Sequence, residues 1–343
     1  MLTTLAAPAF AGTWYIEDGD ITVKAGETEG TNKVSQGANQ EVEDTDTIIK
    51  NREDTASSNT VTIDAGNDKV EVTLDNVNIK TDSGSALTSN GDVTLTLKGE
   101  NHLTGGNGDI YGGDGITSRG SLTISGGTVT ATGGGSTGSN GLGGRGICSD
   151  SGGVTISGGT VKAAGGNGSG ISSSSGVTVS DGTVTANGGN GGNVSGDGIR
   201  SDGGVTISGG TVKAAGGDSK DGYGGDGIRS GGGVTISGNT VNAAGGNGGK
   251  VGGYGICSFD RVAISGGTVE AAGGNGSTGG GSGIYSSVID LSGSLELTAK
   301  AGSPTGKALL QNGRELDLDT IKDKLGPGAK VTATDADGKV IDQ

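Results

Sequence analysis

The stretch VTISGGTVKAAGG occurs twice without a change, at residues 154–166 and 205–217. Near copies begin at residues 122, 177, 234 and 262. A short repeated unit of this kind cannot bury its apolar face alone, so stacked copies must share one continuous core. The repeat therefore predicts an elongated solenoid, and it limits the possible folds more than any other feature of the chain.

The composition excludes the other classes of glycine-rich protein. The chain of 343 residues holds 79 Gly and 3 Pro, with no strict Gly-X-Y period, which excludes a collagen triple helix. Val and Ile recur at fixed places, which excludes a disordered linker. One Trp, five Tyr and two Phe cannot fill a thick globular core. A solenoid remains, because each of its turns buries only a little surface.

Residues 146–170 illustrate one repeat. Three short apolar-alternating runs, each bounded by Gly or Ser, predict three strands and three turns, which together make one coil of a parallel β-helix. The side chains of Thr155, Ser157, Thr160 and Lys162 are expected to point outward. The side chains expected to point inward are those of Ile147, Val154, Ile156, Val161 and Ala163.

A recurring Gly-Ile pair counts the coils, and we expect about nine or ten of them. The successive isoleucines lie 24 to 31 residues apart. Every additional residue enters between the AAGG segment and the next Gly-Ile pair, so one corner of the coil varies while the rest is constant. Variable loops on a constant scaffold are where function usually lies. The isoleucines are Ile116, Ile147, Ile171, Ile199, Ile228, Ile256 and Ile284.

Four regions are expected along the chain. Residues 1–11 are typical of the end of a signal peptide, with a short apolar run and a small-x-small pattern, and predict a secreted or cell-surface protein. Residues 12–58 form an acidic N-terminal cap. Residues 59–302 form the β-helix. Residues 303–343 form a C-terminal cap, with a short helix at 317–325 ended by Gly-Pro.

The net charge of −15 excludes nucleic acid as a partner, because phosphate binding requires a basic surface. No later segment reaches the 18–20 apolar residues that membrane insertion requires. We therefore expect a soluble monomer. Residues 12–71 are the most acidic part, with 14 Asp and Glu against 5 Lys and Arg. Such a surface serves solubility or recruits cations.

The two cysteines are expected to be free thiols. Cys148 and Cys257 both follow a Gly-Ile pair directly, four coils apart. At about 4.8 Å per coil they are separated by roughly 19 Å. A disulfide requires Cα atoms within about 7 Å, so the two cannot be joined.

Four of the five tyrosines lie beside the variable corner, namely Tyr111, Tyr223, Tyr254 and Tyr285. Aromatic side chains stack on the C–H faces of sugars, and the tyrosine hydroxyl adds a polar contact. We predict that these tyrosines, with Arg200 and Arg229, bind carbohydrate. The alternative is that each tyrosine covers a flexible glycine loop.

Two charged repeats, GDGIRSDGG at 196–204 and GDGIRSGGG at 225–233, place Asp197 over Asp226 and Arg200 over Arg229. Stacked carboxylates repel unless a cation separates them, and Ca²⁺ is a suitable hard cation. The sequence thus predicts a possible calcium site. The alternative is a salt ladder in which the arginines neutralise the carboxylates. The candidate calcium ligands are Asp114, Asp197, Asp202 and Asp226.

An outward ladder of hydroxyls is a further pattern. The expected threonine stack resembles the flat faces of ice-binding proteins, although threonine also suits any exposed strand. Its members are Thr73, Thr94, Thr123, Thr155, Thr178, Thr206 and Thr235. A serine stack is expected two places on, at Ser125, Ser157, Ser180, Ser208, Ser237 and Ser265. The array fails at Ala263, which argues against ice binding.

The phrases SGSALTSNGDVTLTLKG and GDGITSRGSLTISGGTVTATGG resemble a family of secreted, carbohydrate-binding proteins of clostridia and other bacteria. The resemblance covers about residues 60–300. It implies an all-β, right-handed, single-stranded parallel β-helix with three short strands per coil, like that of polysaccharide lyases. It also implies binding of plant polysaccharides and of calcium.

The function expected from these observations is non-catalytic binding of a plant or host polysaccharide, with the contact edge on the loops that precede each Gly-Ile pair. A cell-surface adhesin or structural spacer is the alternative. A calcium-dependent lyase could use Asp197, Asp202 and Asp226 with an arginine base. Those residues recur as parts of a repeat, whereas an active site is usually a single departure from its scaffold. The lone His102 offers no catalytic triad.

Overall fold

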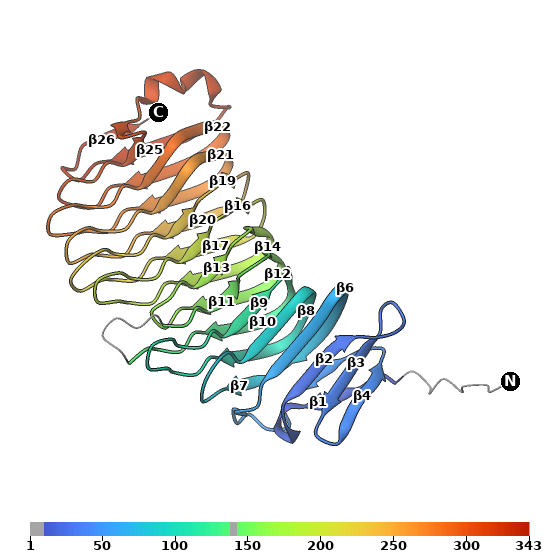
Figure 1. Cartoon of the computed structure of the whole chain (residues 1–343). Coiled ribbons are helices and arrows are strands. Elements are labelled where there is room, and N and C mark those ends of the chain that lie inside the picture. The colour runs from blue at the N-terminus through green and yellow to red at the C-terminus, as the bar shows by residue number, and fades with distance from the viewer. Residues whose placement is uncertain (1–9, 138–142, 343) are drawn as a thin grey trace.

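The computed structural model describes residues 10–137 and 143–342, and it is a parallel β-solenoid (Figure 1). Strands of successive coils pair in parallel along the whole stack, and no α-helix occurs in the described residues. This confirms the all-β, parallel β-helix predicted from the repeat. Nearly all of the predicted signal-peptide remnant lies outside the described residues. Within them, no helix is long and apolar enough to cross a bilayer.

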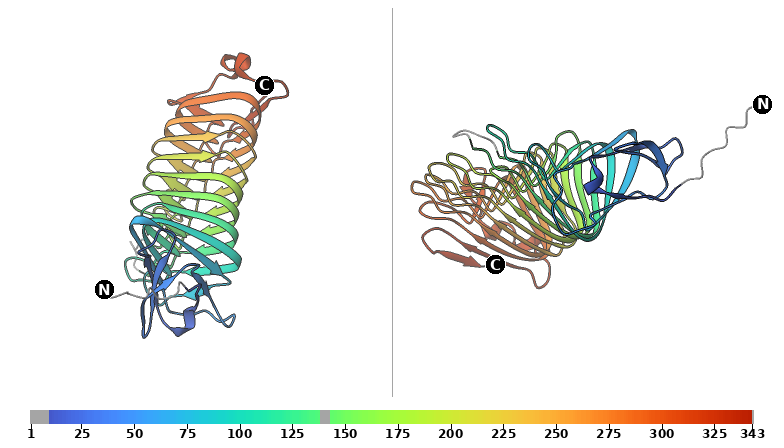
Figure 2. Two further views of the ribbon diagram at one scale, coloured as in Figure 1. Left: turned by 90° about the vertical axis from the view of Figure 1, so that its right-hand side faces the viewer. Right: turned by 90° about the horizontal axis from the view of Figure 1, so that it is seen from below.

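The predicted Gly-Ile register is confirmed. Nine Ile and Leu side chains lie in one buried stack, each paired with its equivalent in the next coil, so the solenoid has about nine turns. Figure 2 shows the coils stacked one on another. A parallel strand ladder repeats at about 4.8 Å, which brings equivalent side chains into contact. The stack consists of Leu87, Ile116, Ile147, Ile171, Ile199, Ile228, Ile256, Ile284 and Leu309.

Each coil has the three predicted strand segments. In residues 146–170 the first is β11 (Ile147–Ser149), and β12 (Gly153–Ala164) contains the other two. A bend divides β12 at Gly159, whose φ of 76° lies in the region that glycine tolerates. All five side chains predicted to point inward are buried. The apolar alternation therefore reports the coil correctly, because one face of every segment is in the core.

The strands of the repeat region follow this plan throughout, and long strands such as β8 contain more than one side of a coil. Their bounds are β6 (Val61–Asp75), β7 (Asn78–Lys80), β8 (Leu87–Thr104), β9 (Ile116–Arg119), β10 (Leu122–Thr132), β13 (Ile171–Ser173), β14 (Gly176–Asn187), β15 (Ile199–Ser201), β16 (Gly204–Ile207), β17 (Thr211–Ala215), β18 (Ile228–Ser230), β19 (Gly233–Ile236), β20 (Thr240–Ala244), β21 (Ile256–Ala272) and β22 (Ile284–Lys300).

The N-terminal region closes one end of the core. Its β2 pairs in parallel with β6, and β2, β3 and β4 form an antiparallel sheet. Trp14 is buried there, and its Nε1 donates a hydrogen bond of 2.7 Å to Asp44. The elements are β1 (Thr13–Tyr15), the 3-10 helix η1 (Ile16–Asp18), β2 (Ile21–Ala25), β3 (Asn32–Gln36), β4 (Asn39–Asp44) and β5 (Ile48–Lys50).

The C-terminal region covers the other end. Where the sequence predicts one short helix at 317–325, the chain forms two 3-10 helices, and the buried side chains of Leu318 and Ile321 lie there. Asp317 caps the first by accepting a hydrogen bond from the Asp319 backbone. The elements are β23 (Leu309–Gln311), β24 (Arg314–Glu315), η2 (Leu318–Thr320), η3 (Lys322–Lys324), β25 (Lys330–Thr334) and β26 (Val340–Asp342).

The glycine-rich loops project together along one edge of the stack (left in Figure 1). Each loop has two legs, the stretches of chain that run to and from its tip. Backbone hydrogen bonds join the two legs in most loops, and further backbone hydrogen bonds join each loop to the next coil. For example, Gly225 N–H donates to the Gly217 carbonyl at 2.9 Å, and Gly246 N–H donates to the Gly225 carbonyl at 2.8 Å. The same alternation runs from Gly106 to Gly166 and again from Gly168 to Gly302. The loops are therefore held in place by backbone hydrogen bonds, both within a loop and between the loops of adjacent coils.

The predicted hydroxyl array is correct only in part. Thr123, Thr155, Thr178, Thr206 and Thr235 do pair in successive coils. Thr94 also belongs to this stack, because it pairs with Thr123. Thr73 does not, because an irregularity in β6 pairs Glu71 with Thr94 and places Thr73 opposite Thr96. The serine stack is also broken, because a bulge after Ile156 pairs Ser157 with Asp181. The array is thus shorter and less regular than the sequence suggests.

Both predicted free thiols are confirmed. Cys148 and Cys257 are unpaired with each other and buried. Cys148 pairs with Ser172, and Cys257 pairs with Arg229 and Tyr285, which places the cysteines four coils apart.

Candidate functional site

The residues that vary most in chemistry lie at the base of each loop. Two positions are involved: the residue two before each stacked isoleucine, called here the pre-Ile position, and the residue directly after it, called the post-Ile position. The isoleucine itself points into the core, so both flanking side chains lie outside it. In one coil they are Asp226 and Arg229, whose side chains form an ion pair of 3.2 Å.

Asp197 and Asp226 use one carboxylate oxygen each to bind the next coil. Oδ1 of Asp197 accepts the backbone N–H of Asp226 at 2.8 Å, and Oδ1 of Asp226 accepts that of Tyr254 at 2.7 Å. The other oxygen faces an arginine of the same coil, since Arg200 lies 3.9 Å from Asp197. The predicted stacking of Asp197 on Asp226 and of Arg200 on Arg229 is therefore present.

Burial governs the protonation of these groups. It raises the pKa of Asp197, and together with the negative charge of Asp197 it raises the pKa of Asp226 to about 7. Burial lowers the pKa of the Arg229 guanidinium, but the charges of Asp226 and Asp197 outweigh this and hold that pKa above its usual value. Arg229 is consequently a fixed cation beside two carboxyl groups that resist ionisation.

Aromatic side chains replace the charged ones in the following coils. The rings of Tyr254 and Tyr285 stack with centroids 5.0 Å apart and an interplanar angle of 17°. Phe259 is 54% exposed, and the Arg229 guanidinium lies 5.1 Å from its ring centroid. Such contacts of a cation with a ring face are attractive. Charged and aromatic coils therefore adjoin in one surface.

We call this surface the base patch. It covers the loop bases of four adjacent coils, from the coil of Ile199 to that of Ile284, and includes two residues, Asp202 and Phe259, of the turns that follow the Ile strands. Its members are Asp197, Arg200, Asp202, Asp226, Arg229, Tyr254, Phe259 and Tyr285.

Three of the predicted site residues lie elsewhere. Asp114 belongs to a coil three steps before that of Asp197, about 14 Å away at the usual strand spacing. It pairs with Arg145 at 3.2 Å. Tyr111 and Tyr223 are more than half exposed and lie toward the loop tips, where Tyr223 pairs with Val194 and Val251. The tyrosines thus form two groups, one at the loop base and one at the tips.

Sequence reasoning did not assign a role to Phe259 or Arg145. Arg145 occupies the pre-Ile position of its coil, so comparison with Asp114 at the same place in the preceding coil could have found the pair. Phe259 takes the turn position that Asp202 and Gly231 hold in earlier coils. The segment GICSFD in place of GIRSGG was the available signal.

Three of the four predicted calcium ligands lie beside arginines. Arginines neutralise Asp114, Asp197 and Asp226, and the exposed Asp202 lies on the turn beyond the Ile strand. Across residues 10–137 and 143–342, no three His, Cys, Asp or Glu side chains gather closely enough to hold a metal ion. These ion pairs have the form of the salt ladder that was the alternative, and the calcium site stays a prediction.

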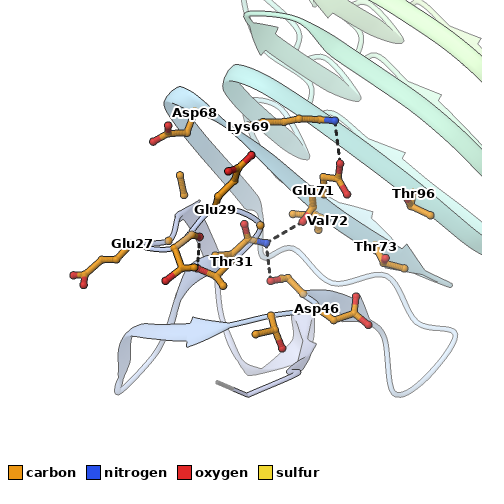
Figure 3. A pocket seen from close by; sticks show the side chains of 17 residues that line it. Glu27, Glu29, Thr31, Asp46, Asp68, Lys69, Glu71, Val72, Thr73 and Thr96 are labelled. Carbon is orange, nitrogen blue, oxygen red and sulfur yellow. Dashed lines mark hydrogen bonds and ion pairs between the residues drawn. The ribbon is translucent and has the colours of Figure 1, made fainter. Parts of the chain in front are cut away.

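A separate acidic groove lies at the N-terminal region. Its cavity of about 620 Å³ is bounded by residues 25–32 and by the outer face of β6 (Figure 3). Lys69 lies there beside Glu71 at 3.0 Å. The amide of Asn32 donates to the backbone carbonyl of Glu71 and to Thr47, both at 2.9 Å. The carboxylates around the groove are Glu27, Glu29, Asp46, Asp68 and Glu71.

The groove accounts for part of the acidity predicted for residues 12–71. It contains no aromatic side chain on which a sugar could stack, and its five carboxylates face one lysine. Its chemistry is therefore unlike that of the base patch, which combines aromatic rings with paired charges.

Comparison with known families agrees with the fold. Three segments, residues 122–144, 154–175 and 205–228, match the family described as Beta helix repeat. Each segment contains a copy of the repeated strand sequence. No curated protein and no solved structure matches the chain. The chain therefore carries β-helix repeats, and its function has to be argued from the base patch.

Proposed function

We propose that this β-helix repeat protein is a secreted or cell-surface, non-catalytic carbohydrate-binding protein, and that the base patch is its contact surface. The observation that carries the proposal is the meeting of exposed Phe259 and half-buried Tyr285 with two ordered Asp–Arg pairs. Exposed aromatic side chains are costly unless they serve a contact, and the chain has only eight aromatic residues.

The residue types suit a sugar. A pyranose ring presents apolar C–H groups on its faces, which pack on aromatic rings, and hydroxyls around its edge. The guanidinium groups of Arg200 and Arg229 donate hydrogen bonds to hydroxyl oxygens, and Asp202 accepts them. Their side chains are ordered by the buried aspartates beside them, so less conformational entropy is lost on binding.

This proposal moves the contact surface from the loops to their bases. The sequence suggests the whole edge before each Gly-Ile pair, including Tyr111 and Tyr223. At the base, however, three aromatic side chains and two arginines adjoin across consecutive coils. At the tips, Tyr223 stands between the aliphatic side chains of Val194 and Val251.

A non-catalytic role fits the electrostatics better than a lyase reaction does. A lyase base must be uncharged to take a proton from the sugar, whereas the paired carboxylates hold the pKa of Arg229 above its usual value. The histidine, His102, lies on β8 and pairs with Asn78 and Thr130, many coils from the base patch.

A surface adhesin is the second candidate. Val194 and Tyr223 are 69% and 56% exposed, and their backbone bridges align them with Val251 in one apolar row along the loop tips. A row of this kind suits a protein partner as well as a sugar. Binding to an array of plant and host glycans separates the two candidates, because an adhesin for proteins would give no glycan signal.

The direct test is a Phe259→Ala, Tyr285→Ala double variant measured on such an array and by isothermal titration with the best ligand. Loss of one packed aromatic side chain costs about 1.5–3 kcal/mol, and about 1.4 kcal/mol is a tenfold change in affinity. We expect at least tenfold weaker binding. The control is Tyr223→Ala, which removes an exposed aromatic at the loop tip and is expected to change affinity less than twofold.

The proposal fails if the wild-type protein binds no glycan. The placement of the site fails if Tyr223→Ala weakens binding more than the double variant does.

A further inference from the structure

The base patch is almost neutral, although the chain carries a net charge of −15. Above about pH 7 the Asp226 carboxyl is ionised, so that Asp197 balances Arg200 and Asp226 balances Arg229. Asp202 is exposed on the same surface and leaves one formal negative charge. A site built for an anionic ligand would show unpaired cations instead.

The guanidinium groups are already engaged. Arg229 lies 3.2 Å from the Asp226 carboxylate and over the Phe259 ring, so a ligand carboxylate would have to compete for it. Drawing Arg229 away would leave Asp226, which is only 4% exposed, without its counter-charge. A buried group that loses its charge partner is strongly destabilised.

An approaching anion would also meet repulsion. Asp202 stands at the edge of the patch, and the whole chain is acidic with a pI near 4.4. Like charges slow the encounter and weaken the complex, most of all at low ionic strength. Sugar hydroxyls meet no such penalty, because they exchange hydrogen bonds with water for hydrogen bonds with the same side chains.

We infer that the ligand of the base patch is a neutral polysaccharide, not a uronic acid polymer or a sulfated glycan. The inference rests on the proposed function and narrows it. The arrangement of the patch also indicates how the polysaccharide chain lies on the protein. Its polar and aromatic parts follow one another along the solenoid axis, and Arg200 and Tyr285 are three coils apart, about 14 Å. An extended polymer lying parallel to the axis contacts both parts at once.

The test compares polymers that differ only in charge. Polygalacturonate and its carboxyl-reduced form share one backbone, and xylan and galactomannan serve as further neutral probes. Affinity electrophoresis and isothermal titration are carried out at pH 8, where Asp226 is ionised, with 20 mM and 200 mM NaCl. We expect that at least one neutral probe binds, with less than twofold change between the two salt concentrations, and that polygalacturonate binds at least tenfold more weakly than that probe.

Stronger binding of polygalacturonate than of every neutral probe would overturn the inference and leave the proposed function standing. Equal binding of the charged and reduced forms would overturn it as well. Absence of binding to all four polymers, and to the glycan array described above, would overturn the inference and the proposed function together.

A charge variant sharpens the test. Asp260→Lys replaces an exposed side chain next to Phe259 that is not assigned to the contact surface, and it reverses the charge there, so it should not disturb the fold. We expect it to increase the retention of polygalacturonate at 20 mM NaCl severalfold and to leave binding of the neutral probe unchanged. An Asp260→Lys protein that loses the neutral probe would contradict the inference, because the exposed carboxylate would then be needed for recognition.

Discussion

The legs of each loop and the base of the same loop stack at the same coil spacing, yet they accept different residues. Gly225 belongs to a leg, and the next residue, Asp226, is the base residue. Legs repeat glycine from coil to coil. The pre-Ile position of successive coils is instead Asp114, Arg145, Ser169, Asp197, Asp226, Tyr254 and Ser282.

The reason is the space beside the backbone. A Cβ atom on Gly225 would overlap the carbonyl oxygen of Gly196 in the preceding coil, because the two legs approach for hydrogen bonding. One residue later the side chain emerges over the outer face of the Ile strand, where both Asp226 and Tyr254 fit. The comparison teaches that a solenoid can vary its chemistry only where stacked backbones leave room, which here is the loop base.

The largest effect is expected from Gly225→Ala. The added methyl group must push the legs apart, which combines overpacking with the loss of buried backbone hydrogen bonds, a cost of about 3 kcal/mol or more. Urea denaturation followed by circular dichroism measures it. The matched control is Gly192→Ala, since nothing lies within 4 Å of a Cβ built there. Equal midpoints for the two variants would show that the legs are not close-packed.

The next effect is expected from Asp226→Ala, at the base. It leaves the Tyr254 N–H without its acceptor and Arg229 without its ion pair, at a cost of about 2 kcal/mol. Asp202→Ala is the control, because that carboxylate is exposed, and we expect a change within about 0.5 kcal/mol. Urea denaturation gives both values. If Asp226→Ala is as stable as the control, the carboxylate does not tie adjacent coils together.

A further effect is expected from pH. The pKa of Asp226 is raised from 3.8 to about 7, so between these values the folded chain holds a proton that the unfolded chain has released. Stability therefore falls as pH rises from about 4 to 7. In Asp226→Asn the side-chain oxygen can still accept a hydrogen bond from the Tyr254 N–H. The amide does not titrate, however, so the pH dependence of stability that arises from Asp226 disappears. Melting midpoints from pH 4 to 8 should decline less in Asp226→Asn than in the wild type, and parallel curves would refute the assignment.

The sequence predicts the scaffold well, because the alternation of apolar and polar residues can be seen within each short segment of the chain. Ile147, Val154 and Ile156 alternate with polar residues, and the same alternation in each coil defines both the strand and its buried face. The predicted pairing of residues between coils was wrong where a strand contains an irregularity that the alternation does not reveal. The irregularity between Asp64 and Lys69 shifts the later residues of β6, so Thr73 meets Thr96 and not Thr94.

The candidate site could be predicted only where repetition itself brings residues together. The Asp197–Asp226 and Arg200–Arg229 stacks were predicted because these residues occupy the same positions in adjacent coils. Contacts between different positions were not predictable, such as the Arg229 guanidinium over Phe259, which joins a post-Ile residue to a turn residue of the next coil. The glycine hydrogen-bond chain also escaped prediction, because composition does not report which legs face each other.

The smallest effect is expected at the post-Ile position of Cys257. This position holds serine at Ser172 and arginine at Arg229, so the scaffold tolerates different chemistry there. We expect Cys257→Ser to change stability by less than about 1 kcal/mol. In the wild type, burial raises the pKa of both thiols and removes the thiolate that reacts. Ellman's reagent should therefore detect no thiol in the native protein and two in urea. Rapid reaction of native Cys257 would mean that the loop base opens, and a destabilised Cys257→Ser would mean that the base is as constrained as the legs.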